Sequence, residues 1–264
     1  MRIAMGISYA GTAYQGWQSQ PSGITVQDTL ERALQSFMAV PDEAAVRTMC
    51  AGRTDAGVHA LNQVIHFDTR VERDSFSWVR GTNRFLPSDI AVQWCQTVPD
   101  SFHSRNSAIG RRYVYIVLES PVRPSVESQR VGWSWRPLSG DAMREAAALL
   151  EGEHDFSAFR SSECQALTPV KHLRRIHIEQ RGAYWRFEFE ANAFLHHMVR
   201  NLMGCLIAVG TGSQAPQWVE KVLAGKKREF AAPTFAADGL YFAGPQYDPK
   251  WGLPQEVAAL SWLP

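Results

Sequence analysis

Residues 50–59 read Cys-Ala-Gly-Arg-Thr-Asp-Ala-Gly-Val-His and lie between two runs that are typical of β-strands. Gly52 and Gly57 bracket Arg53 and Asp55, so the backbone can turn sharply and approach a ligand closely while the Asp side chain points outward. An Arg two residues before an Asp favours the charged form of that carboxylate, which suits nucleophilic or general-base chemistry. The same letters also fit an Asx-type turn that closes a hairpin. This stretch therefore predicts a tight turn between two strands, with Asp55 as the candidate catalytic residue.

The first half of the chain has the pattern of a strand, a helix, two strands, a helix and a strand. Large apolar residues at 3, 5, 7 and 9 alternate with the small residues Ala4, Gly6 and Ser8, a period-2 pattern that predicts the first strand. Thr25 followed by Asp28 has the form of a capping box, and the apolar residues after it fall on one helical face. The remaining predicted elements are a short strand into Cys50, a strand at 63–69, a helix at 74–85 and a strand at 90–97.

The second half repeats this order of elements. A strand at 113–118 is apolar on both faces, as a buried central strand should be. The hairpin predicted around Gly182 has alternating aromatic and charged residues in its second strand. The other predicted elements are a helix at 141–151, the hairpin strands at 174–179 and 185–190, helices at 194–209 and 216–224, and a strand at 240–242.

Two βαββαβ patterns in succession predict a mixed α+β fold built from two ferredoxin-like units. We expect a largely antiparallel central sheet with helices outside it and an active-site cleft between the two lobes. The predicted domains are 1–104, which carries the Asp55 loop, and 105–264. No long low-complexity linker separates the halves, and the junction is expected near 99–110.

Composition narrows the class of protein only broadly. With 264 residues and 45% hydrophobic content, the chain can bury one large core or two ordinary ones. No apolar run approaches 18 residues and the N-terminus runs straight into a strand pattern, so we expect a cytoplasmic protein. The four Cys residues are scattered, which argues against a zinc knuckle or redox motif. Of the 27 basic residues 22 are Arg, which fits phosphate contacts but equally fits a GC-rich genome.

The string Gly-Arg-Thr-Asp-Ala-Gly-Val-His at 52–59 resembles the signature of the TruA family of tRNA pseudouridine synthases. Six further matches follow in the same order along almost the whole chain. They are Tyr-Gln-Gly-Trp-Gln at 14–18, Phe-His-Ser-Arg at 102–105, Arg-Arg-Tyr at 111–113, Asp-Phe-Ser-Ala-Phe-Arg at 155–160, the ten residues 192–201 and Gly-Leu-Tyr at 239–241.

The resemblance implies an enzyme that isomerises uridine to pseudouridine at positions 38, 39 and 40 in the anticodon stem and loop of tRNAs. This rearrangement breaks the bond from base N1 to ribose C1′ and rejoins the base through C5. It needs a positioned carboxylate, a platform for the loose base and exclusion of water, and no metal or organic cofactor. The resemblance further implies a homodimer in which one tRNA spans both subunits.

The resemblance also assigns roles to individual residues. Asp55 matches the catalytic residue, and an Arg at the position of Arg200 lies next to it in the family; Arg53 is a further catalytic candidate. Tyr113 matches the active-site Tyr that packs against the target base, and stacking on an aromatic ring is a common way to hold an extruded RNA base. The candidate substrate-binding residues are Tyr113, Arg111, Arg112 and His197.

Each of these residues also has a structural interpretation. Tyr113 fits the end of a core strand, and Arg200, which projects away from the apolar stripe of the predicted helix, fits an ordinary surface Arg. His197 and its neighbour His196 lack the spacing of a metal site. Two other function classes remain open: an RNA-binding module without catalysis, and a hydrolase that uses Asp55 with a second carboxylate.

Overall fold

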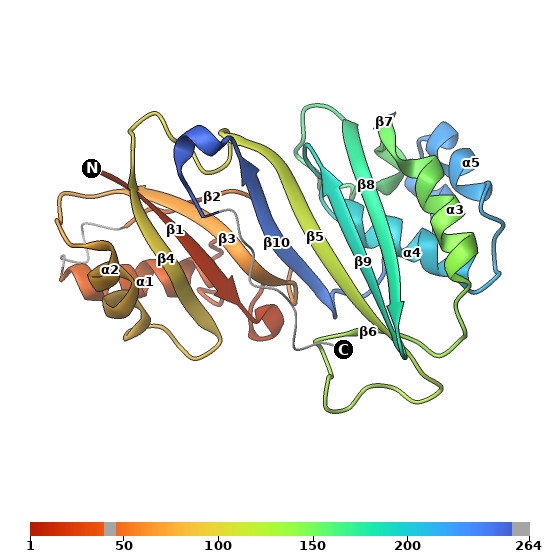
Figure 1. Ribbon diagram of the computed structural model, residues 1–264, viewed down its shortest axis with the longest axis horizontal. Helices are drawn as coiled ribbons and strands as arrows, with labels where there is room; N and C mark the ends of the chain where they lie inside the picture. The colour runs from red at the N-terminus through yellow and green to blue at the C-terminus, as the bar shows by residue number, and fades with distance from the viewer. Residues whose placement is uncertain (40–45, 255–264) are drawn as a thin grey trace. The chain divides into compact units, whose positions relative to one another are not determined.

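The alternation of large and small residues that opens the sequence corresponds to the first of ten strands among the described residues. The computed structural model describes residues 1–39 and 46–254 (Figure 1). These residues form two compact units, one of Met1–Ile109 with the described residues from Tyr241 on, and one of Gly110–Leu240. The first unit contains β1 (Arg2–Tyr9), α1 (Val26–Met38), β2 (Met49–Cys50), β3 (His59–Asp68), α2 (Ser75–Asn83) and β4 (Ile90–Val98).

The sheet of the first unit has the strand order of a split βαβ fold. Strand β1 lies between β4 and β3 and is antiparallel to both, and β2 pairs antiparallel with β3 on its other edge. Strand β10 (Leu240–Tyr247) shares that edge, because it pairs in parallel with His59 and Ala60 whereas β2 pairs with Ile65 and His66. The order β4-β1-β3-β2 is that of a ferredoxin-like unit, as predicted.

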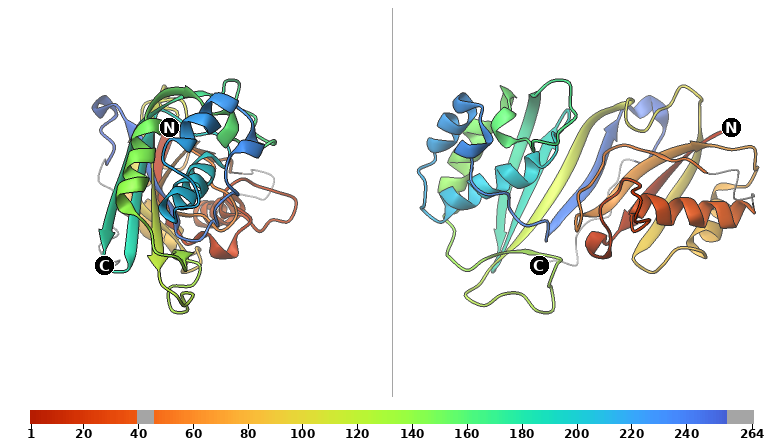
Figure 2. Two further views of the ribbon diagram at one scale, coloured as in Figure 1. Left: turned by 90° about the vertical axis from the view of Figure 1, so that its right-hand side faces the viewer. Right: turned by 180° about the vertical axis from the view of Figure 1, so that it is seen from behind.

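Both helices of the first unit begin at side-chain caps. The Thr25 hydroxyl accepts a hydrogen bond from the Asp28 amide at 3.1 Å, and Asp74 caps α2 through the Ser77 amide at 2.8 Å. The two helices pack on one face of the sheet (Figure 2). Trp78 of α2 is buried there and makes edge contacts with the rings of Phe37 and Phe67.

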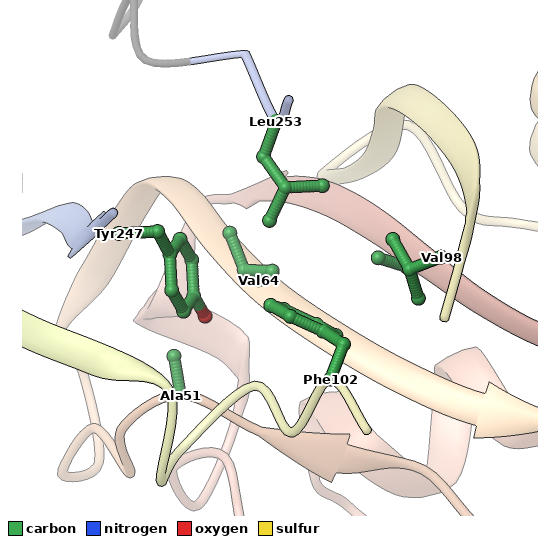
Figure 3. Packing of buried hydrophobic residues seen from close by; sticks show 7 residues of the cluster. Ala51, Val64, Val98, Phe102, Tyr247 and Leu253 are labelled. Carbon is green, nitrogen blue, oxygen red and sulfur yellow. The ribbon is translucent and has the colours of Figure 1, made fainter. Parts of the chain in front are cut away.

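A second apolar cluster lies near the segment that follows β4 (Figure 3). Phe102 is completely buried at its centre, with its ring 5.3 Å from the rings of both Tyr247 and Trp251. The buried members of the cluster are Ala4, Ala51, Val64, Val98, Phe102, Tyr247 and Leu253. Because Ala51 starts the stretch that leads to Asp55, this cluster anchors the base of that stretch.

The second unit repeats the first five elements of this order, with two additional short strands and one additional short helix, whereas the predicted closing strand, β10, belongs to the first unit. Its elements are β5 (Ala108–Glu119), β6 (Gly132–Ser134), α3 (Gly140–Leu150), β7 (Gly152–Asp155), β8 (Val170–Arg181), β9 (Tyr184–Ala191), α4 (Met198–Gly210) and α5 (Trp218–Gly225). The sheet runs β5-β9-β8-β7 with antiparallel neighbours, and β6 pairs in parallel with β5.

One face of the second sheet is apolar and is covered by helices. Trp185, Phe187 and Phe189 of β9 are buried on that face, and the charged residues that alternate with them are half-buried on the other face, as the sequence pattern predicts. Helix α3 packs against β8 and against α4. The hairpin between β8 and β9 turns at Gly182, which has a φ of +59°.

The predicted helix over 194–209 is wrong at its start, because α4 begins only at Met198. His197 has a φ of +62°, a left-handed conformation that ends the helical path toward the N-terminus. Leu195 is buried all the same, although it lies on the preceding segment rather than on the helix. The apolar stripe that places Arg200 therefore starts at Met198, and Arg200 lies in the first turn of α4.

The fold class predicted from the sequence is confirmed: the chain is a mixed structure with mostly antiparallel β-sheet flanked by helices. The last predicted strand, at 240–242, is the start of β10, which extends to Tyr247. Over the described residues, the helices are all too short or too polar to cross a lipid bilayer.

Candidate active site

The stretch 50–59 leaves the first sheet after β2 and returns to it at β3. Asp55 opens a turn in which its carbonyl oxygen accepts a hydrogen bond from the Val58 amide at 3.2 Å. Gly57, the third residue of this turn, has a φ of +80°, the value of a type II turn and one that glycine adopts at low cost. The Asp55 side chain is half-buried, so its carboxylate is carried on a defined turn and retains access to solvent.

A buried side chain ties the backbone to β3 just before the turn. The Ala51 amide donates to the Val64 carbonyl at 2.8 Å, a bond of the sheet type. At the next residue, the fully buried Gln63 donates from Nε2 to the Gly52 carbonyl at 2.5 Å and accepts from the Gly52 amide through Oε1 at 3.4 Å. The Gln63 amide thus replaces a peptide group of a neighbouring strand as the chain leaves the sheet.

Thr54 is held from the side of the loop that follows β1. Its hydroxyl lies 2.8 Å from the Tyr9 hydroxyl, and its carbonyl oxygen accepts from the Trp17 amide at 3.0 Å. Gly16 has a φ of +87°, and a Cβ atom built on it would lie 2.7 Å from the same Thr54 oxygen. The motif at 14–18 therefore has a structural explanation, because its glycine and tryptophan allow two loops to pack backbone against backbone.

The far end of the stretch is fixed through its histidine. The Nδ1 atom of His59 accepts a hydrogen bond from the Gly11 amide at 3.1 Å, so that nitrogen is unprotonated when it accepts this bond. The His59 ring stacks on Tyr241 with 4.7 Å between centroids and 25° between planes. Both ends of the loop are consequently anchored to buried groups of the first unit.

Two exposed arginines, Arg53 and Arg105, lie close to Cys50 at the start of this loop. Burial raises the pKa of the Cys50 thiol to about 11, and the charges of Arg53 and then Arg105 oppose that rise. Both guanidinium groups therefore lie near enough for their positive charge to act at Cys50. This field suits a polyanionic ligand, since phosphate groups are bound largely through Arg and Lys.

The Phe-His-Ser-Arg motif at 102–105 is bonded to β2 and β3, the two strands that flank the same loop. The buried Ser104 donates from its hydroxyl to the Met49 carbonyl in β2 at 2.7 Å, and its own carbonyl accepts from the Tyr247 hydroxyl at 2.6 Å. The His66 ring of β3 lies 2.9 Å from the Ser104 hydroxyl through Nδ1. This motif therefore joins β2 and β3 to the C-terminal segment of the first unit.

In the second unit, Tyr113 lies on β5 opposite Phe189 of β9 and is half-buried. Its ring makes an edge contact with Phe194, with 5.1 Å between centroids and 85° between planes. The two aromatic side chains come from a strand and from the segment before α4, so they fix each other's orientation. A base could be held against such a pair, and the role of Tyr113 stays a prediction.

The two arginines before Tyr113 differ in their surroundings. Arg111 donates from Nη1 to the Asn192 carbonyl at 3.0 Å, which links β5 to the segment before α4. Arg112 faces Glu190 across the strand pair, and its Nε atom is buried without a hydrogen-bond partner among the residues that the structure describes. Their contacts with substrate stay predictions.

Arg200 and His197 lie one turn apart at the start of α4. Arg200 donates from Nε to the Phe235 carbonyl at 3.0 Å, and the Phe235 amide donates back to the Arg200 carbonyl at 3.1 Å. The fully buried Asn201 accepts from the Thr234 hydroxyl at 2.7 Å and donates to the Phe159 carbonyl at 2.7 Å. Segment 234–235 is therefore bonded along the first turn of α4 and fixes the Arg200 side chain.

Sequence reasoning missed the residues that hold these groups in place. Tyr9 and Gln63 have only the pattern of ordinary strand residues, and none of the motifs includes Thr234 or Phe235. One signal was available for β3, since a central strand with polar residues at 62, 63 and 66 must satisfy them internally. No comparable signal marks the segment at 234–235.

The two units carry different candidate groups. The first carries the half-buried Asp55 carboxylate on an anchored turn, and the second carries the Tyr113–Phe194 pair, with Arg111 and Arg112 directly before Tyr113 on β5. Within either unit by itself, the described residues do not bring three His, Cys, Asp or Glu side chains close enough together to hold a metal ion.

Comparison with known proteins identifies the family. The family model described as tRNA pseudouridine synthase matches residues 5–105 and 146–248. Proteins named tRNA pseudouridine synthase A are similar over their whole length: that of Methylibium petroleiphilum is 68% identical over 264 residues and that of Polaromonas naphthalenivorans 66% over 268, each match covering 100% of both chains. That of Variovorax paradoxus is 65% identical, covering 97% of this chain and 95% of its own.

A solved structure titled "Crystal Structure of a Cbf5-Nop10-Gar1 Complex" matches 78% of this chain and 45% of its own, with a TM-score of 0.36 and 12% identity. That likeness is too low to support an argument. The family match and the full-length relatives are sufficient: this chain belongs to the tRNA pseudouridine synthase family, a family of isomerases that act on tRNA.

Proposed function

We propose that this chain isomerises uridine to pseudouridine at positions 38, 39 and 40 of the tRNA anticodon arm, with Asp55 as the catalytic residue and without a cofactor. The observation that carries the proposal is the Asp55 turn. A half-buried carboxylate stands on a type II turn whose flanks at Gly52 and Thr54 are bonded to buried side chains. Such a group is positioned before substrate arrives.

In the proposed reaction the bond from N1 to C1′ breaks, the base turns and a bond from C5 to C1′ forms. N1 gains a proton and C5 loses one, so the reaction is balanced without any oxidant or group donor. The Asp55 carboxylate acts at C1′, at C6 of the base or on a ribose proton; each of these roles needs it ionised. Arg53 and Arg200 are proposed to orient this carboxylate toward the target uridine.

The other candidate residues are proposed to bind the RNA. Tyr113, held at right angles by Phe194, offers a ring face to the target base, and Arg111, Arg112 and His197 are proposed to contact the nucleotides around it. We further propose the domain division 1–104 and 105–264, a cytoplasmic location and a homodimer that binds one tRNA across both subunits. The dimer is expected because one subunit of 264 residues is small beside an L-shaped tRNA. Light scattering at micromolar concentration tests it, and a fully active monomer would contradict it.

The proposed function is tested by Asp55→Asn. Asn has nearly the shape of Asp but no charge, so the loop should keep its form while pseudouridine production from an unmodified tRNA transcript falls below detection. The dissociation constant for tRNA should change by less than about tenfold, because affinity comes mainly from contacts to many phosphates. Product is mapped by reverse transcription after carbodiimide treatment.

Asp100→Asn is the matched control, since Asp100 is an exposed carboxylate of the same unit outside the loop. It should retain wild-type turnover. Appreciable pseudouridine formation by the Asp55→Asn protein would remove Asp55 from the catalytic role. An inactive wild-type protein that still binds tRNA would instead favour an RNA-binding module.

A further inference from the structure

The contact between Gln63 and Gly52 places a buried polar side chain at the point where the Asp55 loop leaves the sheet. Gln63 has no exposed surface, and its amide group bonds both backbone polar groups of Gly52. An apolar residue of the same size would leave the Gly52 carbonyl and amide without these partners inside the protein, which is costly for buried groups. The position therefore serves the backbone of the loop as well as the core.

The contact between Tyr9 and Thr54 fixes the residue directly before Asp55. Both side chains are almost fully buried, and their hydroxyl oxygens lie 2.8 Å apart. Thr54 is also bonded through its carbonyl to the Trp17 amide. A rotation of the peptide between Thr54 and Asp55 would break the bond to Trp17, and a shift of Thr54 as a whole would break both bonds. Either movement would redirect the Asp55 side chain.

We propose that Gln63 and Tyr9 are positioning residues for the catalytic carboxylate: their side chains set the direction of Asp55 by holding the backbone at Gly52 and Thr54. This inference rests on the proposed role of Asp55. Neither residue is placed to touch the reacting atoms, and both act through the loop. Displacement of a catalytic group by about 1 Å can cost about 100-fold in rate, so loosening either contact should slow the chemistry.

A purely structural role would look different, and the protein contains a matched comparison. Asn83 of α2 bonds the backbone of Val92 as Gln63 bonds that of Gly52, with Nδ2 donating to the Val92 carbonyl at 2.9 Å and Oδ1 accepting from its amide at 2.7 Å. This second amide contact lies in the same unit and joins α2 to β4. Its loss should reduce the stability of the fold without moving Asp55.

The first experiment compares Gln63→Met with Asn83→Leu, two replacements that keep side-chain size and remove the amide. Single-turnover rates and dissociation constants are measured with an unmodified tRNA transcript well below the melting temperature of each variant. Both variants should melt earlier than wild type. Gln63→Met should lower the single-turnover rate by about 10- to 100-fold with the dissociation constant within about threefold, whereas Asn83→Leu should leave both near wild type.

A second series keeps the inference testable if Gln63→Met does not fold. Tyr9→Phe and Thr54→Val each remove one hydroxyl and should each slow single turnover about tenfold, and Thr54→Ser, which keeps the hydroxyl, should recover most of the rate. The double variant Tyr9→Phe/Thr54→Val should be no slower than Thr54→Val alone, because the two hydroxyls form one contact.

The inference is overturned if Gln63→Met and Tyr9→Phe turn over at the wild-type rate, or if they lose only as much rate as Asn83→Leu. It is also overturned if their losses appear in the tRNA dissociation constant and the single-turnover rate is unchanged. These outcomes differ from a failure of the proposed function, which would appear as activity in Asp55→Asn whatever the other variants do.

Discussion

Replacing Gly16 with Ala should both destabilise the protein and displace the Asp55 loop. The new Cβ atom would lie 2.7 Å from the Thr54 carbonyl oxygen and 3.2 Å from the Ala56 amide nitrogen, so it meets backbone rather than a flexible side chain. The φ of +87° adds strain of about 1–2 kcal/mol for a residue with a Cβ atom. Overpacking against the loop adds about 1–3 kcal/mol, and reduced freedom of the unfolded chain returns about 0.4–1 kcal/mol.

Gly23→Ala separates the two contributions. Gly23 lies in the same loop with a φ of +66°, but the nearest atom to its added Cβ would be the end of the Arg32 side chain at 3.9 Å. It should lose about 1 kcal/mol of unfolding free energy, and Gly16→Ala about 2–4 kcal/mol. Urea unfolding followed by circular dichroism measures both.

The two variants should differ even more in catalysis. Relief of the Gly16→Ala overlap requires the Thr54 backbone to move by several tenths of an ångström, which should slow single turnover by about tenfold or more, while Gly23→Ala keeps the wild-type rate. Equal stabilities and equal rates for the two variants would refute the argument that the loop after β1 supports the Asp55 turn.

Three further outcomes are expected. Burial, and after it the charges of His103 and Arg2, lowers the pKa of His66 to about 4, so the unfolded chain binds this proton at a higher pH than the folded chain does. The free energy of unfolding should therefore drop by about 1–2 kcal/mol between pH 6.5 and 5. His66→Gln should lack this part of the pH dependence in urea titrations. Arg200→Ala should reduce single turnover more than tRNA affinity, and the reverse result would make Arg200 a phosphate contact. Phe102→Ala removes a ring with no exposed surface and should cost about 3–5 kcal/mol in thermal unfolding, whereas a loss below about 1 kcal/mol would contradict its central place in the core.

Much of the fold could be predicted because its elements follow simple periodicities. The period-2 pattern of residues 3–9 marks β1, although that strand is buried along most of its length; α1 starts at the predicted Thr25 cap, and the hairpin turns at Gly182. The apolar periodicity predicts a start for α4 that is four residues too early, because the periodicity includes Leu195 whereas the helical backbone begins at Met198. Only the left-handed conformation of His197 ends the helix, and a periodic pattern carries no information about one dihedral angle.

The candidate site was predictable as far as the sequence motifs reach. The motifs named Asp55, Tyr113 and Arg200, but they left out the hydrogen bonds that orient them. Gln63 was hidden because an amide side chain inside a strand can face solvent, the core or a neighbouring loop, and the letters do not distinguish these cases. Where Asp55 lies relative to Tyr113 is a matter of tertiary structure that strand patterns do not encode.

The exposure of the residues in the Asp55 loop has a consequence for mutational scanning. Between residues 50 and 59, only Arg53 and Ala56 are exposed; the others are buried or half-buried. Intolerance to substitution at the other eight positions would mix the demands of folding with those of function, so a growth-based scan could not separate them. At Arg53 the effects on folding and on function can be separated, because an exposed side chain contributes little to the core. A strong fitness penalty for Arg53 variants would therefore report a loss of function, with little contribution from a loss of folding stability.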